Sequence, residues 1–138
     1  MIEKFDGLFL LVVFILHFIG HGVYGFRCVF GTKSFLDQYA MHDTGAIMTR
    51  FFGSIFLASF IMALYIMFVR SNGITGTWGF FTLVFLQNLS AFFVGIYTIK
   101  INKLGHTEKT SIEGIIAPGI LTLLSAILCF GLADKIYS

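Results

Sequence analysis

The chain has 138 residues, of which 57% are hydrophobic and only 12% are charged, and its mean hydropathy is +0.91. A soluble domain carries about 25% charged residues, so this chain has too few charges to cover a water-facing surface. Composition therefore excludes an ordinary soluble domain, and the net charge of +2 gives no reason to expect a nucleic-acid partner. The length predicts a single membrane domain, residues 1–138.

Four long uncharged stretches divide the chain, and each is long enough to cross a bilayer. A spanning helix needs about 20 mostly apolar residues, and continuous apolarity favours helices over the alternating strands of a barrel. We therefore predict an all-α integral membrane protein, a four-transmembrane-helix bundle with short connections. The predicted spans are residues 7–26, 49–69, 76–99 and 115–133.

The first span carries a stripe of His17, Gly20, His21, Tyr24 and Cys28 at helical spacing. Two His residues four positions apart can share a metal ion, and neutral imidazole is also a haem ligand. No acidic or thiolate partner is evident near mid-membrane, so we predict no metal site and expect no cofactor. The alternative to a cofactor site at His17 and His21 is neutral imidazoles hydrogen-bonded to neighbouring helices.

The connection after the first span has two interpretations. Ser34 and Asp37 resemble a capping box, and the aromatic and aliphatic residues from Phe35 to Tyr39 fall near one helical face. A short helix lying at the membrane interface and an ordered loop with aromatic anchors both fit this pattern. Asp43 or Thr44 is predicted to cap the second span by accepting from its free N–H groups.

Two arginines mark the ends of the first two spans. Arg27 follows the first span, and Arg50 lies within the first two turns of the second. A long side chain can keep its stem near apolar surface while its head reaches a lipid phosphate or a partner carboxylate. Arg27 and Arg50 are therefore candidates for contact with lipid head groups or partner subunits.

The third span follows a short turn, Arg70 to Gly73, which predicts that the second and third helices form an antiparallel neighbouring pair. Near its middle lie Gln87, Asn88 and Ser90, which would cost several kcal/mol if left unpaired in hydrocarbon. This polar cluster predicts either interhelical hydrogen bonds or a ligand site. Small residues four positions apart, such as Ala91 and Gly95 in the same span, predict close helix packing, either within a compact bundle or at an interface with a partner.

The positive charges predict the orientation in the membrane. Four spans put both termini on one side, and six of the nine Lys and Arg residues then lie on the other side. These six are Arg27, Lys33, Arg50, Lys100, Lys103 and Lys109. Because cytoplasmic loops are enriched in Lys and Arg, the first and third connections are predicted to face the cytoplasm, matrix or stroma.

Several classes of chemistry leave no sequence signature in this chain. No Asp or Glu lies inside a predicted span, which argues against a carboxylate-driven transporter. There is no Ser-His-Asp set, phosphate loop or carboxylate-rich metal box in the sequence. We therefore predict that the protein is not an enzyme.

Four short patterns, in this order, resemble one known family. They are Gly20-His21-x4-Phe26, Arg50-x-Phe52-Gly53 followed by Leu57 and Ser59, Leu89-Ser90, and Ala117-Pro118. The chain resembles the small four-span scaffold family of sterol biosynthesis, a member of which tethers the sterol C4-demethylation enzymes at the endoplasmic reticulum. The resemblance implies a four-span architecture and a non-catalytic role in holding partner proteins. The family pattern has Asn at the position of His21 and Glu at the position of Ala91.

The sequence predicts a non-enzymatic accessory or scaffold subunit of a larger integral-membrane complex. Its expected partners are other membrane subunits and membrane lipids, with bound lipids in place of a cofactor. One alternative is a membrane protein that binds haem, a metal, a quinone, a sterol or another lipid through the His stripe and the third-span polar cluster. Another is a small lipid-modifying enzyme. The membrane concerned, whether endoplasmic reticulum, organellar inner membrane or bacterial inner membrane, stays open.

Overall fold

The computed structural model describes residues 2–138, and these contain helices and turns but no strand. Among these residues, four helices are long and apolar enough to cross a membrane, which confirms the predicted all-α four-helix membrane fold. The four helices are α1 (Leu8–Val29), α3 (Ala46–Leu64), α4 (Trp78–Ile96) and α5 (Glu113–Gly131). A π-helical turn, Tyr65–Val69, extends α3, and a second π-helical turn, Tyr97–Ile101, extends α4.

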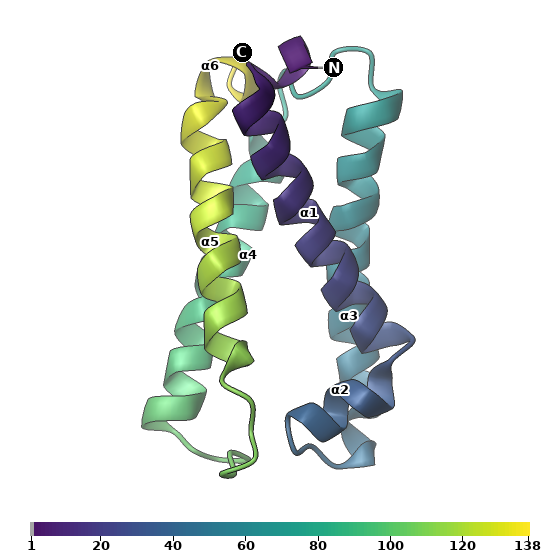
Figure 1. Cartoon of the computed structure of the whole chain (residues 1–138), viewed down its shortest axis with the longest axis vertical. Helices are drawn as coiled ribbons and strands as arrows, with labels where there is room; N and C mark the ends of the chain where they lie inside the picture. The colour runs from purple at the N-terminus through teal and green to yellow at the C-terminus, as the bar shows by residue number, and fades with distance from the viewer. Residues whose placement is uncertain (1) are drawn as a thin grey trace.

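Both ends of the chain lie at the same end of the bundle (Figure 1). The N-terminal 3-10 turn, Ile2–Phe5, and the short helix α6 (Ala133–Ile136) lie there. The connection that contains α2 (Thr32–Gln38) and the α4–α5 connection lie at the opposite end. Four crossings require this arrangement, so the first and third connections share one side of the membrane.

Helix α1 runs diagonally across the bundle and contacts different partners along its length (Figure 1). Near the termini it packs on α5, where Gly131 lies against Leu10, and farther along Gly20 lies against Leu121. Toward the other end it packs on α3, where Gly25 lies against Leu57 and Gly53 against Cys28. Glycine lets the helix backbones approach closely, which is how helices gain packing energy in lipid. The diagonal course of α1 therefore moves its contacts from the α4–α5 pair to α3.

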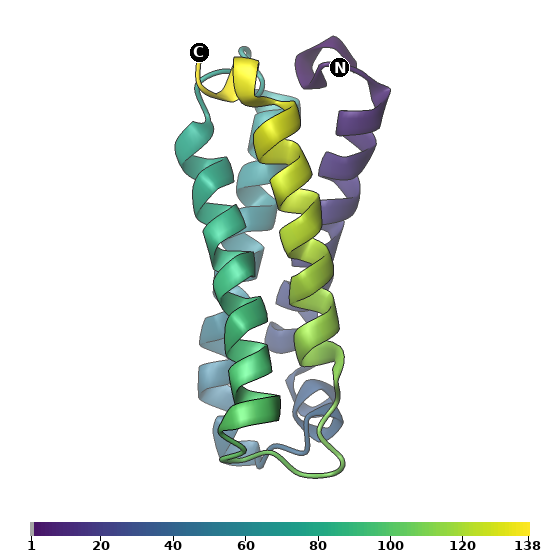
Figure 2. The same cartoon turned by 90° about the vertical axis from the view of Figure 1, so that its left-hand side faces the viewer.

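Helices α4 and α5 form the other close pair and run side by side in both views (Figures 1 and 2). At Gly95 the two backbones approach so closely that a methyl group would overlap the Gly114 carbonyl oxygen. The close packing predicted from the small residues of the third span is therefore confirmed, and it lies inside the molecule.

The apolar core fills the half of the bundle near the termini. The Phe14 ring lies 4.6 Å from the Phe5 ring and 4.7 Å from the Phe18 ring, measured between ring centroids. Phe81 of α4 and Leu128 of α5 complete this cluster and are almost fully buried. Because lipid is as apolar as these side chains, dispersion contacts and fit hold this half together, with little help from the hydrophobic effect.

The prediction that the second and third helices form a neighbouring pair is wrong. Within the described chain, α3 packs on α1 and α4 packs on α5, while α3 and α4 barely touch. The turn between them closes on itself instead: Gly73 and Gly76 adopt positive φ, and the Arg70 guanidinium donates to the Thr75 carbonyl at 2.7 Å. A short connection keeps two helix ends near each other, whereas packing along their length depends on complementary surfaces.

The connection after α1 does contain a helix, α2, but the predicted capping box does not form. Helix α1 continues to Val29, and α2 begins after Gly31, which offers no side-chain cap. The Thr32 hydroxyl donates back to the Cys28 carbonyl at 2.8 Å and so joins the two helices. Because α2 already begins at Thr32, Ser34 lies inside the helix and cannot be its N-cap.

The predicted cap of the second span is also wrong. Helix α3 begins after a 3-10 turn, Asp43–Gly45, and Gly45 at its start makes no side-chain cap. The His42 imidazole accepts from the Thr44 N–H at 3.3 Å and caps the 3-10 turn instead. The extra turn satisfies backbone groups that a side-chain cap would otherwise serve.

The predicted orientation can be checked by cysteine labelling. Ser34 and Thr107 are exposed in the two connections at one end, and Ser71 is exposed in the turn at the other end. We expect single cysteines at positions 34 and 107 to react with a membrane-impermeant reagent only from the cytoplasmic, matrix or stromal side. A cysteine at position 71 should react only from the other side. The reverse pattern would contradict the orientation.

Candidate functional site

A pocket with a volume of about 450 Å³ lies between the α1–α3 pair and the α4–α5 pair. It occupies the half of the bundle away from the termini, where α1 has moved onto α3. Its walls are mostly apolar, with Phe52 and Phe56 on the α3 side and Val94 and Pro118 on the α4–α5 side. Pockets that bind small molecules typically measure about 300–1,000 Å³ and have largely apolar walls. The pocket is therefore the candidate functional site.

Two polar side chains line the pocket near the middle of the membrane. Gln87 and Ser90 lie on α4, and Ser90 is halfway along the 24-residue span Trp78–Ile101. Within residues 2–138 no hydrogen bond reaches either side chain, whereas Ser59 and Ser125 donate to carbonyl groups of their own helices. The sequence analysis treated Gln87, Asn88 and Ser90 as one polar cluster. In the structure Asn88 points into the protein and bonds to His17, whereas Gln87 and Ser90 face the pocket.

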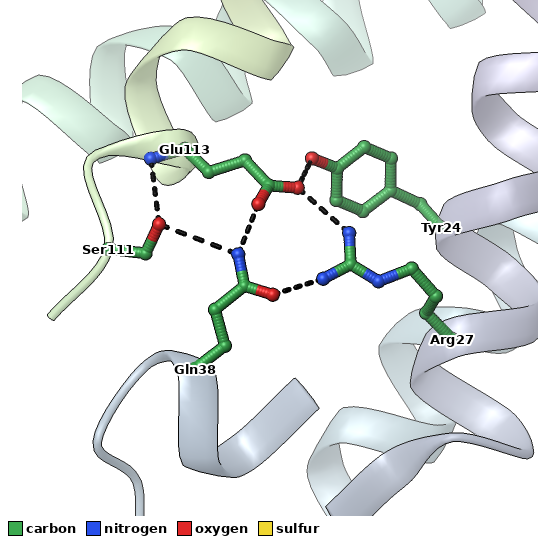
Figure 3. A network of polar contacts seen from close by, with 5 residues as sticks. All are labelled: Tyr24, Arg27, Gln38, Ser111 and Glu113. Atoms are coloured by element: carbon green, nitrogen blue, oxygen red, sulfur yellow. Dashed lines mark hydrogen bonds and ion pairs between the residues drawn. The ribbon is translucent and has the colours of Figure 1, made fainter. Parts of the chain in front are cut away.

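A ring of hydrogen bonds lies at the other end of the pocket (Figure 3). Glu113 accepts from the Tyr24 hydroxyl, from the Arg27 guanidinium at 2.8 Å, and from the Gln38 amide. The Gln38 side-chain oxygen accepts in turn from Arg27. The Ser111 hydroxyl oxygen accepts from the Glu113 N–H at 3.2 Å. These five residues join α1, α2 and the start of α5.

This ring has two consequences for the site. It ties α2 and the start of α5 to α1 at the end of the pocket that Tyr24 and Glu113 line. It also pairs the Arg27 and Glu113 charges, whose side chains are 35% and 30% exposed, so that the site carries no net charge there. Arg27, a predicted contact for head groups or partners, is thus bound within the protein. Arg50 is exposed, and among residues 2–138 its one hydrogen bond goes to the Thr32 hydroxyl, at 3.2 Å.

Tyr39, just after α2, is another polar group that lines the pocket. Burial is the main cause that raises the pKa of its phenol to about 12, and the negative charge of Glu113 adds to the effect. The Tyr39 hydroxyl is therefore a neutral hydrogen-bonding group at physiological pH.

We expect Glu113→Ala to lower the free energy of unfolding by about 1–2 kcal/mol, because Arg27 and Gln38 lose their shared acceptor. Glu113→Gln, which keeps one oxygen acceptor, should cost less. Thermal unfolding in a mild detergent measures both. The control is Glu108→Ala, at an exposed position of the same connection. An equal effect of the Glu108 and Glu113 substitutions would show that the ring does not stabilise the bundle.

The predicted His stripe faces the protein interior. His17 and His21 are both fully buried, and their ring centroids are 4.7 Å apart. The Asn88 amide nitrogen donates to His17 Nε2 at 2.9 Å and also lies 3.4 Å from the Ser125 hydroxyl. Because His17 Nε2 accepts, a neutral His17 carries its proton on Nδ1. The structure therefore joins two predicted candidates, His17 and Asn88, in one interhelical contact.

Three buried nitrogen atoms in this cluster have no hydrogen-bond partner within the described chain: His17 Nδ1 and both ring nitrogens of His21. The Phe56 ring packs edge-on against His21 at 5.1 Å between centroids and also lines the pocket. Phe56 thus stands between His21 and the pocket. Among residues 2–138 no group of three or more potential metal ligands comes together, so His17 and His21 are brought together without a third such ligand.

The ring residues Tyr24, Gln38 and Glu113 were not predicted as a site. One signal was available: Arg27 ends the first span and Glu113 begins the fourth, on the same side of the membrane and with opposite charges. Such a pair is a candidate ion pair between helices. The position of Gln38 depends on how α2 packs against α1 and α5, which the local pattern of the connection does not reveal.

Comparison with known proteins adds no relative to this picture. No protein-family model, no curated protein and no solved structure gives a significant match to the chain. The resemblance to the sterol-biosynthesis scaffold family therefore stays a prediction.

Proposed function

We propose that this protein binds a lipid-soluble small molecule inside the membrane, in the pocket between its two helix pairs. The observation that carries the proposal is the pocket of about 450 Å³ with apolar walls and polar groups at two depths. Phe52 and Val94 line it and are 46% and 60% exposed. The pocket is therefore accessible from the lipid-facing surface between α3 and α4, where a molecule dissolved in the bilayer would enter.

The size of the pocket favours a small molecule over a helix from a partner subunit. One turn of an α-helix about 10 Å across and 5.4 Å long occupies roughly 420 Å³. The pocket volume of about 450 Å³ thus equals about one turn, whereas a spanning helix needs about five or six turns. The accessory-subunit hypothesis stays a prediction, and any partner helix would pack on the outer surface of the bundle.

The charges around the pocket favour an uncharged occupant. The Arg27 and Glu113 charges compensate each other, and the other side chains that line the pocket are neutral. An ion in this position would lose its hydration without gaining a free counter-ion, which costs several kcal/mol. Shape and hydrogen bonding would therefore determine which molecule binds.

The test fills the pocket. Val94→Trp places a large ring at the pocket wall, while Phe93→Trp, at the adjacent and equally exposed position, lies outside the residues that line the pocket. Protein is placed in nanodiscs made from a total lipid extract, and native mass spectrometry counts the retained small molecules. We expect wild type and Phe93→Trp to retain one molecule and Val94→Trp to lose it at least about tenfold. Equal retention by the two variants, or none by wild type, would refute the proposal.

A further inference from the structure

We propose that the bound molecule carries an uncharged carbonyl or hydroxyl group in its membrane-buried part, and that Gln87 and Ser90 bind this group. The inference rests on the proposed function and adds the chemical class of the ligand. Gln87 and Ser90 are the polar side chains that line the pocket near the middle of the membrane, and neither has a hydrogen-bond partner among residues 2–138.

Within the described chain, Gln87 and Ser90 are unpaired in a part of the bundle where most polar side chains are bonded. The other polar groups of the spans are mostly bonded within the protein: Asn88 to His17, Thr122 to the Pro118 carbonyl, and Ser125 to the Leu121 carbonyl. Gln87 and Ser90 have no such bond within residues 2–138, and both line the pocket. An unsatisfied polar group in hydrocarbon costs several kcal/mol. A bound molecule that pairs with both would remove this cost.

Gln87 and Ser90 point in the same direction from α4. Residues three positions apart on a helix lie on the same face, so Gln87 and Ser90 form one polar patch one turn long. The glutamine amide offers donors and an acceptor, and the serine hydroxyl offers both. A ketone or quinone-type carbonyl can accept from the two side chains together. A hydroxyl group can donate to Gln87 and accept from Ser90.

The depth of Gln87 and Ser90 in the membrane excludes the charged groups of common lipids as their partners. Ser90 is halfway along its span, so the patch lies far from the phosphate groups of a phospholipid. A carboxylate or an ammonium group at this depth would have no counter-ion, since the Arg27–Glu113 pair lies at the far end of the pocket. The patch therefore suits a neutral group on the chain or ring of a lipid-soluble molecule.

The experiment compares two photoreactive probes in phosphatidylcholine nanodiscs. One is a diazirine derivative of hexadecan-8-one, which has a mid-chain carbonyl, and the other is the matched diazirine derivative of hexadecane. We expect wild type to cross-link the ketone at least about tenfold more than the alkane, as two hydrogen bonds of about 0.6–2 kcal/mol each would require. Peptide mapping should place the cross-link on the pocket walls.

Substitutions of the patch should remove the preference without removing binding. Gln87→Leu combined with Ser90→Ala should bring ketone labelling down to the alkane level. Ser90→Ala alone removes a single oxygen atom and should lower ketone labelling in part. This single variant keeps the test valid if the double variant does not fold. The matched control is Ser54→Ala, exposed on α3 and outside the pocket lining, which should keep the full preference.

The outcomes separate the two proposals. If Val94→Trp abolishes labelling by both probes but wild type labels with both equally, the pocket binds lipid-soluble molecules without recognising a polar group. That result overturns this inference and leaves the proposed function intact. If neither probe labels the pocket, and wild type retains no molecule from the lipid extract, both proposals fail. A ketone preference that survives in the double variant also overturns the inference.

Discussion

Gly95→Ala should lower the free energy of unfolding by about 2–3 kcal/mol, although it adds only one methyl group. The added carbon would overlap the backbone carbonyl oxygen of Gly114. A backbone atom cannot rotate aside as a side chain can, so α4 and α5 must move apart. Overpacking of this kind typically costs about 1–3 kcal/mol, and here it would weaken the contact that holds the α4–α5 pair together.

The matched control for this prediction is Gly79→Ala in the same helix. An added methyl group at Gly79 meets no atom within 4 Å, so alanine there should stabilise the helix by about 0.5–1 kcal/mol. Thermal or denaturant unfolding in a mild detergent measures both variants. If the two proteins are equally stable, the close approach of α4 and α5 is wrong.

Asn88→Leu should lower the free energy of unfolding by about 2 kcal/mol. Leucine has the same number of side-chain heavy atoms in the same branched arrangement, so it fills the site while the amide that serves His17 is lost. The buried Nε2 atom of His17 would then have no partner, which costs about 1–3 kcal/mol. This change tests whether the contact seen at 2.9 Å between α1 and α4 stabilises the bundle.

A double-mutant cycle gives the sharper form of this test. Replacing both partners of a buried hydrogen bond by apolar groups can be nearly neutral. The double variant His17→Leu with Asn88→Leu should therefore be more stable than the sum of the two single losses predicts, by about 1 kcal/mol. Strictly additive losses would show that the two side chains do not interact.

Local sequence predicted the helices well for a physical reason. In a bilayer every backbone N–H and C=O must be satisfied within its own segment or by its neighbours in a closed sheet. The long uncharged run of residues 7–26 must therefore form a helix, and nearly all of it lies in α1. The predicted caps failed because helix ends are set by the neighbouring chain: Thr32 bonds back to α1, and a 3-10 turn precedes α3.

The candidate site was predicted only in part. Gln87, Asn88 and Ser90 stood out because polar residues are rare inside apolar spans. Which of them pairs inside and which faces a pocket depends on the rotation of α4 relative to α1 and α5. The hydrogen bond from Asn88 to His17 joins residues 71 positions apart, and no local pattern determines such a contact.

The sequence by itself determined that this is a four-helix membrane protein with its termini on one side, because length and apolarity act within each segment. Only the tertiary structure decided which helices pair. Glycines at positions 25 and 53 bring α1 onto α3, and Gly95 brings α4 onto α5. These contacts leave α3 and α4 apart and so create the pocket. The pocket is lined by helices that are far apart in the chain, and it forms where their surfaces do not fit together. Its position therefore depends on how the helices pack, which no single segment determines.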